Sequence, residues 1–164
     1  MSEGSRPAPR SPRRLASVFF ADEQERPIEI ERLRDLAAHV LEDQRVPAAM
    51  ELNVLCVERP AMAELNARHM GSEGATDVLA FPMDAPGESV AGQPAILGDV
   101  VLCPEVAAAQ AAEQGVTETS ELELLLVHGI LHLLGHDHAE EGERHRMFTL
   151  TDQLLAGFRS SAQP

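Results

Sequence analysis

The sequence lacks several residue types, and each absence narrows what the chain can do. It has no tryptophan, no tyrosine and only two cysteines, Cys56 and Cys103, which lie far apart. Two separated cysteines provide no disulfide framework and are typical of a reducing compartment. No apolar run approaches the roughly 18 residues of a membrane span, and no apolar core follows the basic N-terminus. We therefore expect a cytoplasmic protein without a membrane span or signal peptide.

Lysine is also missing, so all 13 basic residues are arginines, against 27 acidic residues and a net charge of −14. This balance argues against nonspecific binding to duplex DNA, which depends on many phosphate contacts. It leaves room for a nucleic-acid substrate held at one site by a metal and a few arginines. Arg59 and Arg68 are candidates for such contacts, and ordinary surface charges are an equally good interpretation of both.

Length and composition predict one globular domain with short tails. The chain has 164 residues, of which 44% are hydrophobic, enough for a single core. Residues 1–13 are rich in proline, serine and arginine and predict a disordered N-terminal tail. We expect the domain itself at residues 14–159 and a C-terminal tail at residues 160–164.

Apolar periodicity and turn residues predict four strands and five helices. The strands are expected at residues 15–20, 52–57, 76–81 and 95–103, with the last two forming a hairpin. The helices are expected at residues 27–41, 60–70, 104–115, 120–134 and 140–159, and residues 84–94 indicate an exposed loop. This order predicts an α/β (α+β) sandwich, in which a small mixed sheet of about four strands packs with about five helices.

Four of the seven histidines lie in residues 127–138, VHGILHLLGHDH. His128 and His132 are four residues apart, so on a helix both project toward one point. Gly135 can end that helix in a left-handed conformation and turn the chain back, which would bring His138 to the same point. Three imidazoles with an open fourth position are the usual catalytic zinc site. We therefore predict one zinc ion per chain, bound by His128, His132 and His138.

The predicted helix around His128 and His132 is apolar on nearly every side, which is typical of a central, buried helix. Imidazoles placed among leucines need hydrogen-bond partners, and a shared metal supplies them. Ser120 and Glu123 lie three residues apart just before the apolar run, which predicts a capping box at the helix N-terminus. The fold prediction therefore places the metal site on a central buried helix.

The remaining polar residues of this region are weaker candidates. His136 lies in the predicted turn and His145 in a charged run, so we expect both to face solvent. Asp137 precedes His138, where it would either orient a ligand imidazole or stabilise the turn.

A zinc protease is one alternative, because the spacing from His132 onward matches the second half of the metzincin pattern, H-x-x-G-x-x-H. Those enzymes carry a glutamate directly after the first histidine as general base. Here that position is Gly129, which argues against peptide hydrolysis and suggests open space beside the metal for a bulky substrate. A zinc hydrolase of peptides or small molecules remains an alternative.

The histidine-rich stretch resembles the signature of the YbeY family of bacterial rRNA-maturation endoribonucleases. Three further segments are similar in order and spacing: ELNARHM (64–70), TDVLAFPMD (76–84) and LGDVVLCPEVA (97–107). The resemblance implies a single-strand-specific, metal-dependent endoribonuclease of the bacterial cytoplasm. It implies roles in 16S rRNA 3′ end maturation and ribosome quality control, with single-stranded rRNA as substrate. The small ribosomal subunit or its proteins are the implied partners, with no DNA and no membrane.

The resemblance also implies residue roles and shows two departures. His128, His132 and His138 match the family's zinc ligands. The family often has tyrosine where His136 stands. Many members have an arginine shortly after the Leu-Asn pair of the second segment, a place that Met70 takes here.

Three questions about the site stay open at this stage. Arg68 lies two residues before Met70, so it either replaces the family's arginine or leaves that role vacant. No general base is assigned, and either water or the RNA 2′-hydroxyl fits as the nucleophile. A noncatalytic ribosome-assembly factor with a structural zinc is the other alternative, which would need a fourth ligand such as Cys103.

Overall fold

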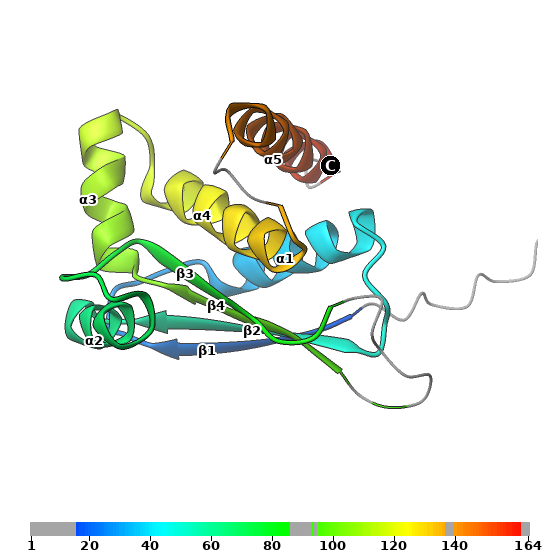
Figure 1. The fold of residues 1–164 in the computed structure, drawn as a ribbon. Coiled ribbons are helices and arrows are strands. Elements are labelled where there is room, and N and C mark those ends of the chain that lie inside the picture. Colours follow the sequence, from blue (N-terminus) through cyan, green and yellow to red (C-terminus); the bar gives the residue numbers. More distant parts are fainter. Residues whose placement is uncertain (1–15, 86–92, 94, 137–139, 162–164) are drawn as a thin grey trace, which may run out of the picture.

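A four-stranded sheet forms the centre of the fold in the computed structural model, which describes residues 16–85, 93, 95–136 and 140–161 (Figure 1). The strands are β1 (Ser17–Glu23), β2 (Met50–Val57), β3 (Val78–Pro82) and β4 (Ala95–Leu102). Their order is β1-β2-β4-β3, so β3 lies at an edge. The β1–β2 and β2–β4 pairs are parallel, and β3 is antiparallel to β4. The predicted mixed sheet and the pairing of its last two strands are confirmed.

Within the described part of the chain, five helices pack with this sheet, as predicted: α1 (Ile30–Asp43), α2 (Arg59–Met70), α3 (Pro104–Gln114), α4 (Glu118–Leu133) and α5 (Glu141–Ser161). Figure 1 shows α1, α3, α4 and α5 on one side of the sheet. The helix α2 packs on the other face, where Met62 shares a small apolar cluster with Val57, Leu79 and Val101. None of the described helices is long and apolar enough to cross a membrane.

The helix α4 is the central element of the helical layer. It contacts α1, α3, α5, β3 and β4, and most of its residues are buried. The expectation of a central buried helix is therefore confirmed. Its sides are not purely apolar, because Glu123 is only 2% exposed. This carboxylate accepts hydrogen bonds from Arg32 of α1 (2.8 Å) and Arg159 of α5 (3.5 Å), so it ties three helices together.

The predicted capping box at Ser120 and Glu123 is wrong. The N-cap of α4 is Thr117, whose hydroxyl oxygen accepts the Ser120 backbone N–H at 3.0 Å. The sequence contains two candidate caps three residues apart, and the helix starts at the earlier one because Gly115 has already ended α3. Ser120 therefore lies inside the first turn, and Glu123 is free to bind the two arginines.

Thr117→Ala should lower the free energy of unfolding by about 1 kcal/mol, because the first turn of α4 loses its side-chain acceptor. Ser120→Ala is the matched control. It keeps the N–H that the cap uses and should change stability by less than about 0.5 kcal/mol. Urea unfolding of the two variants measures the difference. A larger loss for Ser120→Ala than for Thr117→Ala would contradict the observed cap.

Element boundaries differ from the predictions at several ends. The helix α1 begins at Ile30 with Glu29 as its N-cap, so Pro27 precedes it instead of opening its first turn. The strand β1 continues past the predicted Phe20 to Glu23, because its pairing with β2 runs to the end of that strand. Most of the predicted exposed loop and of both tails lies outside the described residues, and the domain limits stay a prediction.

Candidate active site

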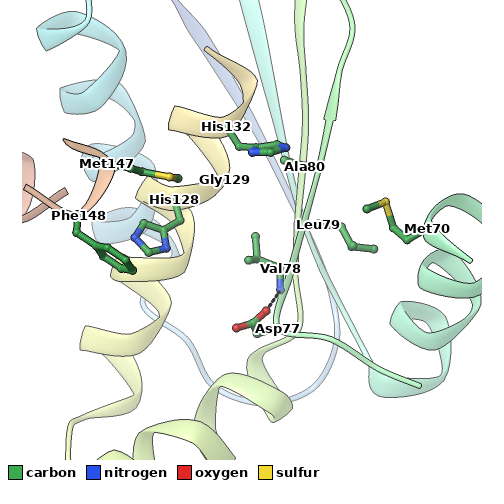
Figure 2. A pocket seen from close by; sticks show the side chains of 10 residues that line it. All are labelled: Met70, Asp77, Val78, Leu79, Ala80, His128, Gly129, His132, Met147 and Phe148. Carbon is green, nitrogen blue, oxygen red and sulfur yellow. Dashed lines mark hydrogen bonds between the residues drawn. The ribbon is translucent and has the colours of Figure 1, made fainter. Parts of the chain in front are cut away.

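One pocket of about 310 Å³ brings together the two helical histidines of the predicted site. Its walls come from α4, from the edge strand β3, from the start of α5 and from the end of α2 (Figure 2). The lining residues are Met70, Asp77, Val78, Leu79, Ala80, His128, Gly129, His132, Met147 and Phe148. Most of them are apolar, so polar groups are few and placed at particular points of the wall, as in typical ligand sites.

His128 and His132 reach the pocket from successive turns of α4, as their spacing predicts. His128 is half-buried, and its ring lies 5.4 Å from the Phe148 ring in an edge-on arrangement. His132 is exposed at the other end of the helix turn. Two imidazoles that line one pocket form a donor set that fits a transition-metal ion.

The chain turns back after α4 as predicted. Gly135 has a φ of +96°, and the His136 N–H donates to the Leu131 carbonyl oxygen at 3.0 Å. This left-handed turn needs glycine. His138 and Asp137 follow the turn but lie outside the described residues, so the three-histidine ligand set stays a prediction. Within the ranges that the structure describes, three potential ligands do not gather at any one point.

His136 and His145, the two weaker candidates, differ in their exposure. His145 is exposed on α5, as expected. His136 is half-buried in the turn instead of fully exposed, because its backbone closes the end of α4. Neither lines the pocket.

The interpretation of Gly129 as open space beside the metal is wrong. A Cβ atom at this position would lie 2.7 Å from Val100 Cγ1 of β4 and 3.3 Å from Val78 Cγ2 of β3. Glycine is therefore needed because the helix packs closely on the sheet. A glutamate at this position would meet the same two valines, of which Val100 is fully buried, so the protease base has no place here.

The two candidate arginines are both engaged at the surface and do not line the pocket. Arg68 forms an ion pair with Glu64 at 2.8 Å, and Arg59 forms one with Glu105 at 3.1 Å. Such exposed pairs contribute little to stability. Met70, in contrast, lines the pocket, with 59% of the residue exposed. The suggestion that Arg68 replaces an arginine at this wall has no support in its contacts.

Sequence reasoning missed a group of polar residues at the base of the pocket. Asp77 lines the pocket, and its Oδ1 accepts the Val78 N–H at 2.8 Å. When the Gln110 amide of α3 is oriented with its nitrogen toward these carboxyl groups, it donates to Asp77 Oδ2 (3.1 Å) and Glu121 Oε1 (3.3 Å). Glu121 is 3% exposed. The pKa of this carboxyl is raised, first by burial and then by the charge of Asp77. Only the match of residues 76–84 to the family pointed to this region.

Replacing Glu121 should change how stability depends on pH. A carboxyl whose pKa is raised on folding favours the native state at low pH, and that contribution is lost as pH rises through the folded pKa. In the folded protein the pKa of the Glu121 carboxyl is raised above 4.5, the ordinary value for a glutamate. Wild type should therefore lose stability relative to Glu121→Gln above pH 4.5, while the variant's amide oxygen still accepts from Gln110. Urea unfolding across pH measures this, and two parallel stability curves would contradict it.

The fold and the pocket together define a class of protein. A small α/β domain whose buried central helix presents two histidines, four residues apart, to a largely apolar pocket has the arrangement of a metal-dependent hydrolase.

Comparison with known proteins identifies the family. The family profile described as Endoribonuclease YbeY matches residues 19–159. Proteins named Endoribonuclease YbeY from Salinispora tropica and Thermobifida fusca are both 49% identical to the chain. The alignment with the Salinispora protein covers 88% of this chain and 98% of the relative. The alignment with the Thermobifida protein covers 90% of this chain and 97% of the relative. The chain therefore belongs to the YbeY family of endoribonucleases, which are metal-dependent nucleases.

A solved structure agrees with the fold. The solution structure of a protein from Thermotoga maritima is similar with a TM-score of 0.58 and 25% identity. The match covers 88% of this chain and 93% of the other.

Proposed function

We propose that the chain cleaves single-stranded RNA with a zinc ion held by His128, His132 and His138. The observation that carries the proposal is the presence of two α4 imidazoles on one pocket, in a chain whose relatives are named endoribonucleases. The third ligand follows from the family resemblance and from the Gly135 turn, which reverses the chain just before it. A bound zinc ion would supply Lewis acidity toward the scissile phosphodiester.

The chain's own residues position and enclose the reacting groups. The rigid helix α4 sets the spacing of the two imidazoles, and the Phe148 ring packs against one of them. The edge strand β3 forms the facing wall. Most of the other lining side chains are apolar, so few protein groups compete for the polar contacts that the two imidazoles make.

The geometry gives no support to a carboxylate base. Among the described lining residues, Asp77 alone is a carboxylate. One of its oxygens accepts the Val78 N–H, and the other lies within reach of the Gln110 amide. Both oxygens of Asp77 therefore face donor groups of the chain itself. The proposal therefore takes the RNA 2′-hydroxyl, which the substrate itself supplies, as the nucleophile. Its oxygen bonds to the phosphorus while the bond from phosphorus to the 5′ oxygen breaks, and the proton of the 2′-hydroxyl passes through water to the leaving 5′ oxygen. The products are a 2′,3′-cyclic phosphate and a 5′-hydroxyl.

The biological substrate follows from the family. The proposal takes the 3′ end of 16S rRNA as the target, in the context of the small ribosomal subunit and of ribosome quality control in the cytoplasm. A net charge of −14 favours delivery of the RNA by such a partner over unaided capture. Cys56 and Cys103 are free and buried, which is consistent with a reducing compartment.

One experiment tests metal and substrate together. The purified chain is analysed for bound metals, stripped with a chelator and reloaded with zinc. It is then given single-stranded RNA, duplex RNA, single-stranded DNA and casein in parallel. The expected result is one zinc per chain and zinc-restored cleavage of single-stranded RNA alone. A single 2′-deoxy substitution at the cleavage site should block the reaction. Cleavage that persists in the stripped protein, or that ignores the 2′-deoxy substitution, would refute the corresponding part.

A further inference from the structure

Two large apolar side chains are exposed at the mouth of the same pocket. Phe148 of α5 is 47% exposed and Met70 of α2 is 59% exposed. Figure 2 shows them on opposite sides, with Val78 and Leu79 between them. The neighbour of Phe148 along the helix, Met147, is buried at 6% and fixes the turn from which the ring projects. Isolated exposed apolar residues are ordinary, whereas a pair facing one pocket indicates a binding surface.

The charge of the described lining favours a flat, weakly polar group over a phosphate. No arginine lines the pocket within the described residues, and Asp77 is the one carboxylate among them. Arg59 and Arg68 are paired with glutamates elsewhere on the surface. A nucleobase is the part of an RNA that fits apolar and aromatic walls, because every base has a face that stacks on an aromatic ring.

The facing wall offers hydrogen-bonding groups for the edge of a base. The Cys103 N–H donates to the Asp77 carbonyl oxygen at 2.9 Å, and the Met83 N–H donates to the Leu97 carbonyl oxygen at 3.1 Å. In an antiparallel pair the residues between such partners direct their N–H and C=O groups away from the neighbouring strand. Ala80 is such a residue, and it lines the pocket on the free edge of β3.

We propose that Phe148 stacks on the base of a nucleotide next to the scissile bond and so selects an unpaired strand. The inference rests on the proposed function and deepens it, because it assigns the substrate preference to a named side chain. A base held between stacked neighbours in a duplex cannot also stack on Phe148. Single-strand preference then follows from the need to lay one base against this ring beside His128.

The test uses the full-length, zinc-loaded chain and a short single-stranded RNA with one mapped cleavage site. Phe148→Ala should raise KM by about 5- to 100-fold, the range expected for the loss of one stacked base. Phe148→Trp should keep KM near the wild-type value. Phe148→Leu is the matched apolar control, and it should resemble alanine because it packs but does not stack. Zinc content should stay the same in all three variants.

A substrate change separates stacking from a general loss of structure. RNAs with an abasic site at each position flanking the cleavage point are compared in wild type and Phe148→Ala. At one position the missing base should raise the wild-type KM by the same factor as the alanine substitution. At that position it should add nothing to the variant. Equal abasic effects in the two enzymes, or a leucine variant that behaves like wild type, would overturn the inference. If wild type itself shows no zinc-dependent cleavage, the proposed function fails instead.

Discussion

His132→Ala should reduce the cleavage of single-stranded RNA by at least about a hundredfold and release most of the bound zinc. The imidazole supplies one of only two described nitrogen donors to the pocket, and a site left with two ligands holds zinc weakly. His132 is exposed, so in the metal-free protein its loss should change the free energy of unfolding by less than about 0.5 kcal/mol. Parallel measurements of metal content, cleavage rate and urea unfolding check all three expectations.

His145→Ala is the matched control for this substitution. His145 is also an exposed helical histidine, but it lies on α5 and does not line the pocket. It should keep full metal content and activity. Both variants are purified in the same way. A contaminating ribonuclease would then give the same activity in both, whether or not His132 is present. Unchanged zinc content and unchanged cleavage in His132→Ala would refute the metal-site proposal.

Local features of the sequence predicted the elements and the two helical histidines well. Periodicity and glycine placement depend on contacts within a few residues, so they can be read without knowing the fold. The four strands, the central position of α4 and the Gly135 turn follow from such signals. The histidine pair belongs to this group, because the spacing within one helix alone decides that both side chains share a face.

Features set by distant segments could not be predicted in the same way. The sequence does not reveal that Glu123 meets Arg32 and Arg159, because these residues come from three separate helices. Phe148 and Asp77 join the histidines only once α5 and β3 have packed around α4. The capping box failed for a related reason, since two good caps lay close together and the preceding helix end decided between them.

Gly129→Ala should destabilise the protein by up to about 2 kcal/mol, even though alanine is the better helix former. In an exposed helix this change gains roughly 1 kcal/mol. Here the new methyl group would stand 2.7 Å from Val100 Cγ1, a side chain that is fully buried on β4. Overpacking of this kind costs about 1–3 kcal/mol, because neither helix nor sheet can move freely. This cost outweighs the gain in helix propensity. Urea unfolding measures the loss.

Gly157→Ala on α5 is the matched control, because the new Cβ would lie 3.6 Å from the His39 ring, an ordinary contact distance. It should stabilise the protein by about 0.5–1 kcal/mol.

A double-mutant cycle then identifies the cause at Gly129. Trimming the opposing side chain with Val100→Ala should remove the clash. The double variant should therefore lose less stability than the two single variants lose together, by about 1 kcal/mol or more. Additive effects would contradict the close approach of α4 to β4. Because Gly129 also lines the pocket between the two histidines, the rigid packing at this contact sets the distance between the imidazoles and the β3 wall.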